Sequence, residues 1–195
     1  MMNKILRRIL SFPTLLICSS VFGQWQNVGS PAFSAGQSSY TSLTVDKDGT
    51  PYLAFQDQSD GMNKITVMKY SSGSWVNVGP ARFSFGEADY ISLAIDSASG
   101  TLYVAYDDQS NGNGGATVRK FNGTNWDTLG TSDFTASDAP YTTLIVKNGT
   151  PYLAFEDFNN SFKTTVMKYT NNAWSDVGTE GFSAGSADYI SLAMD

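Results

Sequence analysis

The chain is organised by the stretch Trp25-Gln26-Asn27-Val28-Gly29, which returns as Trp75–Gly79, Trp126–Gly130 and Trp174–Gly178. These copies hold the four tryptophans of the chain, at intervals of 50, 51 and 48 residues. A nearly constant interval of this size is typical of a tandem array of one supersecondary unit. Each unit of such an array buries its apolar surface against the next. The sequence therefore predicts an architecture, but it does not disclose a specific activity.

One repeat unit reads as four β-strands, which in the first full copy are expected at 40–46, 52–57, 65–70 and 74–78. Lys47-Asp48-Gly49-Thr50 joins the first two strands as a hairpin turn, because glycine accepts the positive φ of tight turns, and Asp46 and Asp48 are expected to shape this turn. Inner strands such as Tyr52-Leu53-Ala54-Phe55 are apolar on both faces, so both faces must be covered. No helical periodicity follows the N-terminal segment, so sheets must pack on sheets. We therefore expect an all-β fold, a β-propeller of four-stranded antiparallel blades, with a β-solenoid as the alternative.

The expected propeller is incomplete. Residues 24–195 divide into a strand at 24–29, blades at 36–79, 87–130 and 138–178, and the start of a next blade at 186–195. This makes about three and a half blades, whereas propellers close with about four to eight. The end of the chain, Tyr189–Asp195, copies Tyr90–Asp96 and stops within a repeat. We expect the remaining blades of the same protein beyond residue 195, with 24–29 completing the last one; alternatively, another chain supplies the missing strands.

The first 23 residues have the pattern of an export signal. Lys4, Arg7 and Arg8 precede an apolar run at 9–22, and Gly23 offers a cleavage site. Serines and a proline interrupt the run, which is shorter than the ~20 apolar residues of a membrane span. We therefore expect a signal peptide at 1–23, no membrane span in the mature chain, and a secreted or cell-surface location.

The composition excludes several kinds of site. The full chain has a formal net charge of −6 and no histidine, and its one cysteine lies in the expected signal peptide. Residues 24–195 hold 9 Lys and Arg against 18 Asp and Glu. Disulfide scaffolds, thiol nucleophiles, Ser-His-Asp triads and His-ligated zinc are thereby excluded within these residues. The acidic balance argues against a nucleic-acid partner, which clustered basic residues would have to bind.

Five motifs recur together: Trp-x-x-Val-Gly, Phe-Ser-x-Gly, Tyr-x-Ser-Leu-x-x-Asp, Gly-Thr-Pro-Tyr-Leu-Ala-Phe and Thr-Val-Met-Lys-Tyr. With them the chain resembles secreted bacterial β-propeller repeat proteins, broadly kelch-like in repeat length, over essentially all of 24–195. The resemblance implies a surface or secreted protein of the Gram-negative, type IX-secreted kind, and it implies an architecture only. The third copy departs from the pattern, with Lys147 in place of Asp46 and Asp96, and Ser137 in place of Gly36 and Gly86.

The candidate sites lie in the loops after the second strand of each blade, which vary while the strands barely change. The candidate ligand-binding residues are Asp57, Asp60, Asp108, Asn111, Asp157, Phe158, Asn160 and Phe162. The repeated Asp57, Asp108 and Asp157 could ring a channel and hold calcium, or they could cap loop amides at the strand ends. The lack of an EF-hand spacing favours capping. The repeated tryptophans, with Tyr40, Tyr90, Tyr141 and Tyr189, are expected to pack in the core and not to form sugar-stacking platforms.

These features are typical of a secreted or cell-surface module for binding or adhesion, with a glycan or protein ligand, or of a structural spacer. No residue is assigned a catalytic role, and no cofactor beyond the calcium hypothesis is expected. The alternative is a glycoside hydrolase or other hydrolase on a propeller scaffold, its site completed by residues beyond 195. Such an enzyme needs two facing carboxylates, for which Glu87, Glu156 and Glu180 are available. A sialidase would also need an arginine cluster, and only Arg82 and Arg119 follow the signal peptide.

Overall fold

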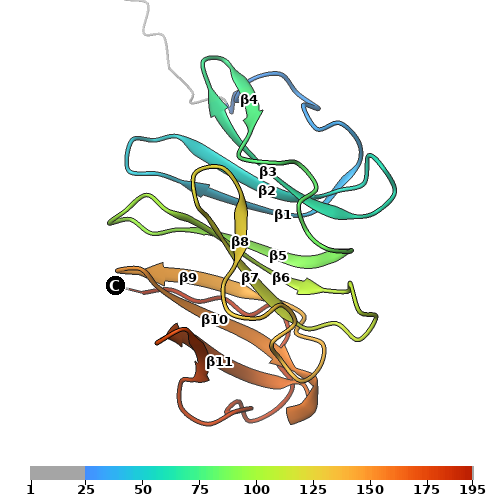
Figure 1. Ribbon diagram of the computed structural model, residues 1–195, viewed down its shortest axis with the longest axis vertical. Coiled ribbons are helices and arrows are strands. Elements are labelled where there is room, and N and C mark those ends of the chain that lie inside the picture. Colours follow the sequence, from blue (N-terminus) through green and yellow to red (C-terminus); the bar gives the residue numbers. More distant parts are fainter. Residues whose placement is uncertain (1–24, 195) are drawn as a thin grey trace, which may run out of the picture.

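The computed structural model describes residues 25–194, so the expected signal peptide at 1–23 lies outside the described residues. The described chain forms three four-stranded antiparallel sheets, which follow one another along the molecule in chain order (Figure 1). The first sheet contains β1 (Ser38–Val45), β2 (Pro51–Asp57), β3 (Lys64–Ser71) and β4 (Ser74–Asn77). The second contains β5 (Ala88–Ile95), β6 (Leu102–Asp108), β7 (Ala116–Phe121) and β8 (Trp126–Thr128). The third contains β9 (Thr143–Lys147), β10 (Thr150–Asp157), β11 (Lys163–Thr170) and β12 (Ala173–Asp176), with a 3-10 turn, η1 (Phe158–Asn160), after β10.

This arrangement confirms the expected fold class, an incomplete β-propeller of four-stranded antiparallel blades. Strands in each sheet are adjacent in the order in which they occur in the chain. The four strands of the first blade begin and end within two residues of their predicted bounds. Within residues 25–194, no helix is long and apolar enough to cross a membrane.

The hairpin between β1 and β2 shows why the turn sequence matters. The Oδ1 atom of Asp46 accepts hydrogen bonds from the amides of Asp48 (2.9 Å) and Thr50 (2.8 Å). Gly49 has a φ of +84°, which favours glycine because it has no Cβ. The hydrogen bond from Thr50 is the main reason why the pKa of Asp46 lies below its usual value. The prediction that Asp46 shapes this turn is confirmed.

Two apolar clusters lie between the sheets, and β6 contributes to both. Every residue of β6 is buried. Val104 and Tyr106 pack with Ile65 and Val67 of the first blade, whereas Tyr103 and Ala105 pack with the third blade. Alternate side chains of a strand point to opposite faces of its sheet. This explains why the inner strands are apolar on both faces and confirms that sheets pack on sheets.

The repeated tryptophan joins each blade to the segment that precedes it. The indole Nε1 of Trp126 donates a hydrogen bond to the carbonyl oxygen of Val78 (2.9 Å), and Trp174 does the same to Leu129 (3.0 Å). The Trp126 ring also stacks on Phe83, with centroids 4.9 Å apart and planes 8° from parallel. The backbone passes so close that a Cβ on Gly79 would lie 2.9 Å from Phe121 and 3.3 Å from Trp126. The tryptophan period is therefore the period of the contacts between blades.

The repeated tyrosines also pack with this period. The rings of Tyr40, Tyr90, Tyr141 and Tyr189 form a row with successive centroids 5.2, 4.9 and 4.9 Å apart. All four residues have a positive φ, between 46° and 53°, which is unusual for a bulky side chain. In the first two blades this residue lies in the register shift of the first strand. The rings thus pack on one another, but the prediction that they lie in the core is wrong for the two ends of the row, since Tyr40 and Tyr189 are 41% and 83% exposed.

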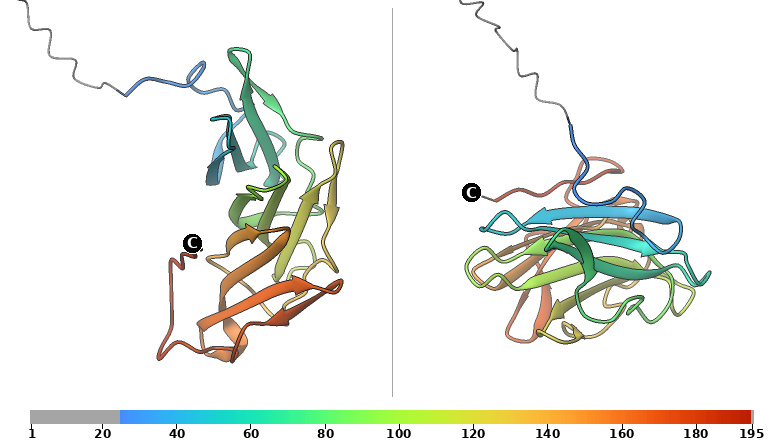
Figure 2. Two further views of the ribbon diagram at one scale, coloured as in Figure 1. Left: turned by 90° about the vertical axis from the view of Figure 1, so that its left-hand side faces the viewer. Right: turned by 90° about the horizontal axis from the view of Figure 1, so that it is seen from above.

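The two ends of the described chain differ from the expected strands. Neither 25–29 nor 186–194 forms a strand, since a strand needs a paired neighbour and neither segment has one within the described residues. Each nevertheless makes contacts of its repeat: the Val28 carbonyl accepts from Trp75 Nε1 (2.9 Å), and the Ala187 amide donates to Phe162 (2.9 Å). Figure 2 shows the C-terminal segment running as a coil beside the third sheet.

Candidate ligand-binding rim and inter-blade pocket

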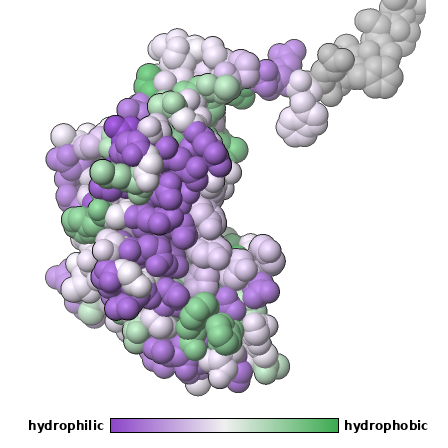
Figure 3. Space-filling model, turned by 90° about the vertical axis from the view of Figure 1, so that its right-hand side faces the viewer, coloured by the Kyte–Doolittle hydropathy of each residue, from purple (hydrophilic) through white to green (hydrophobic). Residues whose placement is uncertain are grey.

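The loops that follow β2, β6 and β10 project on one side of the molecule, on the right in Figure 1, and the hairpins before these strands turn on the other. Figure 3 shows this loop side face on. It is mostly hydrophilic, and a hydrophobic patch stands toward the end away from the N-terminal residues. The eight candidate residues lie in these loops or, for Asp57, Asp108 and Asp157, at the strand ends where the loops begin. The loops form one rim of the propeller.

The three repeated aspartates cap their own loops. The Oδ1 atoms of Asp57, Asp108 and Asp157 accept hydrogen bonds from backbone amides two residues further on, at 3.0, 3.1 and 3.1 Å. Their Oδ2 atoms accept from threonine hydroxyls of the next strand, at 2.9, 3.0 and 2.7 Å. The aspartates are buried, and each uses both oxygens within its own blade. Among the described residues, no group of three or more Asp or Glu could hold a metal ion.

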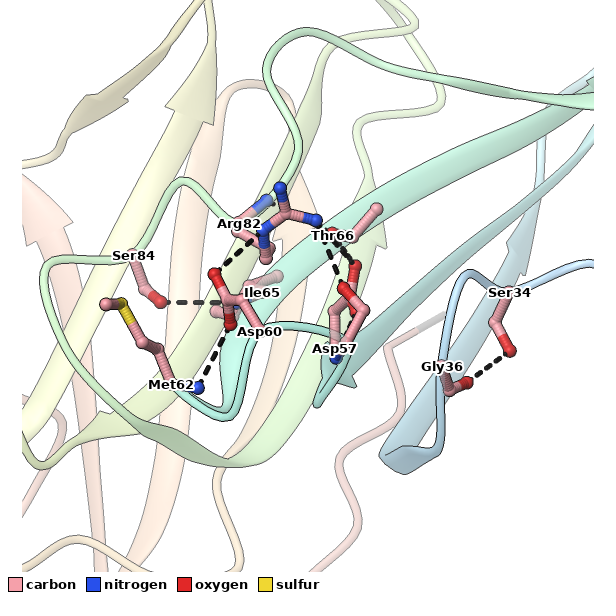
Figure 4. Close-up of polar contacts among 10 residues, drawn as sticks. Ser34, Gly36, Asp57, Asp60, Met62, Ile65, Thr66, Arg82 and Ser84 are labelled. Carbon is pink, nitrogen blue, oxygen red and sulfur yellow. Dashed lines mark hydrogen bonds and ion pairs between the residues drawn. The ribbon is translucent and has the colours of Figure 1, made fainter.

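In the first blade an arginine closes the loop, as Figure 4 shows. Arg82 Nε lies 3.0 Å from Asp60 Oδ2, and Arg82 Nη1 lies 3.7 Å from Asp57 Oδ2. Burial acts to raise the pKa of Asp57, but hydrogen bonds from Ser59 and Thr66 and the charge of Arg82 outweigh it and hold the pKa below its usual value. The carboxylates of Asp57 and Asp60 are therefore already bound by residues of the first blade and of the connection that follows it.

The other candidates divide between the second and third blades. Asn111 donates through Nδ2 to Asp133 Oδ2 and accepts through Oδ1 from the Asn113 amide, so it organises its own loop. Phe158 and Phe162 pack edge to face, with centroids 4.7 Å apart. They are 39% and 46% exposed, which makes this pair an apolar contact surface on the rim.

Asp157 and Asn160 line a pocket of about 210 Å³ in the third blade. Its apolar wall consists of Phe134, Ala136, Phe155 and Met167. Its polar groups are those of Asp157, Asn159, Asn160, Asp176 and Glu180. An apolar wall with a few convergent polar groups is the usual composition of a small-ligand site. The structure thus brings two predicted ligand-binding residues together with Glu180, which the sequence offered only to the hydrolase alternative, and with eight residues that sequence reasoning did not single out.

The polar groups of the pocket form a short network. Asn160 Nδ2 donates to Asp157 Oδ2 (2.8 Å) and, more weakly, to Glu180 Oε2 (3.4 Å). Gly181 makes room for this asparagine, because a Cβ at residue 181 would lie 2.6 Å from the Cβ of Asn160. The corresponding residue of the first blade is Arg82, which covers Asp57 instead. The one sequence signal for an open pocket was therefore Gly181, a glycine at a position where the other copies carry larger residues such as Arg82.

Asp107 is a further titratable residue that sequence reasoning missed. It is 2% exposed and accepts hydrogen bonds from the Gly115 amide (2.8 Å) and from Gln109 Nε2 (2.9 Å). Burial raises the pKa of Asp107 to about 6, although the amides of Gly115 and Ala139 act in the opposite direction. The first and third blades have Gln56 and Glu156 at this position, so no residue type is repeated there.

No family model matches the chain, and no curated protein matches it. Among solved structures it is similar to a protein of unknown function from Dyadobacter fermentans, with a TM-score of 0.51, 14% identity, and coverage of 78% of this chain and 54% of the other. It is also similar to a family 117 glycoside hydrolase from Zobellia galactanivorans, with a TM-score of 0.50, 10% identity, and coverage of 73% and 55%. A fucose lectin from Kordia zhangzhouensis, in complex with methyl-fucoside, matches with a TM-score of 0.46, 16% identity, and coverage of 72% and 99%.

The described chain thus spans about half the length of the Dyadobacter and Zobellia structures. At identities of 14% and 10%, these likenesses show the fold alone. The fold alone does not determine the binding or catalytic residues of this chain.

Proposed function

We propose that the chain is a glycan-binding module of a secreted or cell-surface protein, and that its ligand enters the pocket of the third blade. The observation that carries this proposal is the composition of the pocket wall. Phe134, Phe155 and Met167 offer apolar surface to the faces of a sugar ring, and Asn159, Asn160 and Glu180 offer hydrogen-bonding groups to its hydroxyls. The volume of about 210 Å³ suits a single sugar residue of a longer chain.

A glycoside hydrolase is the second candidate, because Asp157, Asp176 and Glu180 line the same pocket. Glycoside hydrolysis uses two carboxyl groups, of which one donates a proton and the other acts as nucleophile or base. Asp157 accepts hydrogen bonds from Asn159, Asn160 and Thr165, so both of its oxygens are engaged in holding the loop. Asp176 and Glu180 remain for chemistry, but both side chains are exposed to solvent, so neither is fixed as the acid or the nucleophile of such a pair, and binding is the function that the pocket supports better.

The test is a glycan array followed by calorimetric titration of the best ligand. Asn160→Ala removes a polar group of the pocket, and Asn111→Ala, at the same loop position of the second blade, is the matched control. We expect Asn160→Ala to weaken binding by about fivefold to tenfold, the loss of one hydrogen bond, and Asn111→Ala to leave it unchanged. Equal affinities for the two variants would place the ligand elsewhere.

The same samples separate binding from hydrolysis. Release of shorter products by the wild type, abolished by Glu180→Gln, would establish the hydrolase. Retention of the ligand without product release supports the binding module.

The proposed export has its own measurement. Expression of the complete sequence in a bacterium with a signal peptidase, followed by N-terminal sequencing, is expected to give a mature chain that begins at Gln24. An uncleaved cytoplasmic product would refute the signal peptide.

A further inference from the structure

The second blade departs from the other two at three positions that meet in space. The substitutions relative to the first and third blades are Tyr106 for Phe55 and Phe155, Arg119 for Met68 and Met167, and Phe85 for Ala35 and Ala136. Arg119 Nε donates a hydrogen bond to the Tyr106 hydroxyl (3.1 Å), and Arg119 Cζ lies 4.2 Å from the ring centroid of Phe85. Three independent departures in a conserved repeat pattern thus form one cluster.

The guanidinium of Arg119 is buried and has no direct ion pair among the described residues. Arg119 is only 6% exposed. Nη1 donates to the carbonyl oxygen of Trp126 (3.3 Å), while Nη2 is buried and has no hydrogen-bond partner. Among the ion pairs of residues 25–194, none involves Arg119. A buried charge without a direct ion pair is costly, and the contact with the Phe85 ring and the charge of the buried Asp108, which lies beside the Tyr106 hydroxyl, offset only part of that cost.

The third blade shows what space this cluster fills. The corresponding residues there, Ala136, Phe155 and Met167, line the open pocket of about 210 Å³. In the second blade the longer side chains of Phe85 and Arg119 stand at these positions. Phe85 is 61% exposed, whereas Tyr106 is fully buried. Phe85 is therefore the group that is free to move away and uncover the guanidinium.

We propose that the second blade holds a separate site for a carboxylate-bearing ligand, such as a uronic acid residue of a glycan, with Arg119 as the anion-binding group and Phe85 as a cover over it. A planar carboxylate matches the remaining N–H donors of Nη1 and Nη2, and an arginine presents them in a fixed fork that a lysine lacks. Tyr106 holds the guanidinium through Nε and so orients its free edge. This site does not depend on the pocket of the third blade.

The chain itself suggests two of the test variants, because Arg119→Met and Phe85→Ala each restore the residue of the other blades. Arg119→Met removes the anion-binding group, Phe85→Ala removes the cover, and Arg119→Lys keeps the charge without the fork. The probe is galacturonic acid, with galactose as its neutral counterpart, titrated into the full chain by calorimetry. Thermal unfolding followed by circular dichroism verifies that each variant is folded.

We expect galacturonic acid to bind and galactose not to bind. Phe85→Ala should tighten binding about tenfold, because the open state no longer has to be selected from a mostly covered one. Arg119→Met should abolish binding in both the wild-type and the Phe85→Ala background, and Arg119→Lys should weaken it strongly. If galacturonic acid binds to Phe85→Ala but not to the wild type, the result supports the site equally.

Three results would overturn the proposal: equal affinity for galactose, binding that survives Arg119→Met, or no binding of galacturonic acid by folded Phe85→Ala. The Asn160→Ala variant separates this site from the proposed function, because it should leave galacturonic acid binding at Arg119 unchanged. A loss of galacturonic acid binding in Asn160→Ala, with retention in Arg119→Met, would assign that ligand to the third blade.

Discussion

Replacement of Trp126 by phenylalanine tests whether the indole hydrogen bond between blades stabilises the fold. The matched control is Trp75→Phe. Trp126 is 5% exposed and donates to Val78 in the buried interface, whereas Trp75 makes the same 2.9 Å bond to Val28 at the exposed end. Both indoles stack on a phenylalanine, at 4.9 and 4.6 Å, and phenylalanine at these positions keeps that stacking.

The magnitude follows from burial. In Trp126→Phe a buried carbonyl oxygen loses its partner, which costs about 1–3 kcal/mol, and the lost ring volume adds roughly 1 kcal/mol. In Trp75→Phe water replaces the indole, so the loss should stay below about 0.5 kcal/mol. The difference of about 1.5–4 kcal/mol corresponds to a Tm difference of roughly 3–16 °C for a chain of this size.

The assay is urea unfolding followed by far-UV circular dichroism, because tryptophan fluorescence changes with the substitutions themselves. Trp174→Phe, whose indole is partly buried, should fall between the other two. Equal losses for Trp75→Phe and Trp126→Phe, with unchanged m-values, would refute the reasoning that the buried bond matters.

Three further outcomes are expected. Since the native pKa of Asp107 lies near 6, above its ordinary value of 3.8, its contribution to stability is complete below about pH 4 and is lost as the pH rises through 6, at a cost of up to roughly 3 kcal/mol. The free energy of unfolding of Asp107→Asn, measured with urea, should therefore rise relative to that of the wild type between pH 4 and pH 7.5. A difference between the two proteins that stays constant with pH would show that Asp107 is not the cause. Millimolar calcium should leave the Tm unchanged, because Asp57, Asp108 and Asp157 already use both oxygens, and a rise of several degrees in a thermal melt would instead support a calcium site. Leu43 and Phe182, on the first and last blades, are 62% and 59% exposed, so sedimentation velocity should show self-association that Leu43→Lys with Phe182→Lys reduces; a monodisperse wild-type monomer would count against it.

Much of the fold could be predicted because its determinants are local. The turn at Asp46 and Gly49 depends on residues within four positions of one another, and the strands of the first blade follow from their apolar pattern. The loop-capping role of Asp57 was also readable, because an aspartate at a strand end commonly accepts hydrogen bonds from the next amides. The periodic tryptophans added the one long-range inference that a repeat allows, namely that neighbouring units pack alike.

The candidate site was predicted only in part. Asp157 and Asn160 were identified from their loop, but Phe134, Phe155 and Met167 belong to stretches that look like ordinary parts of the repeat. They line one pocket because the connection between blades folds back over the strands of the third blade, a contact that no local pattern reports. The meeting of Arg119 with Phe85 is of the same kind: each departure is visible in the sequence, but their contact is not.

The sequence by itself determined the repeating unit, its strands and its turns, because hydrogen bonding within a hairpin and alternation along a strand act over a few residues. Only the tertiary structure decided where strands are missing and where a pocket opens. Residues 25–29 and 186–194 carry the repeat pattern without forming strands, since backbone pairing requires a neighbour that no stretch of sequence supplies to itself. The pocket likewise depends on side-chain volumes contributed by segments far apart in the chain, as Gly181 and Arg82 show at corresponding positions in two blades.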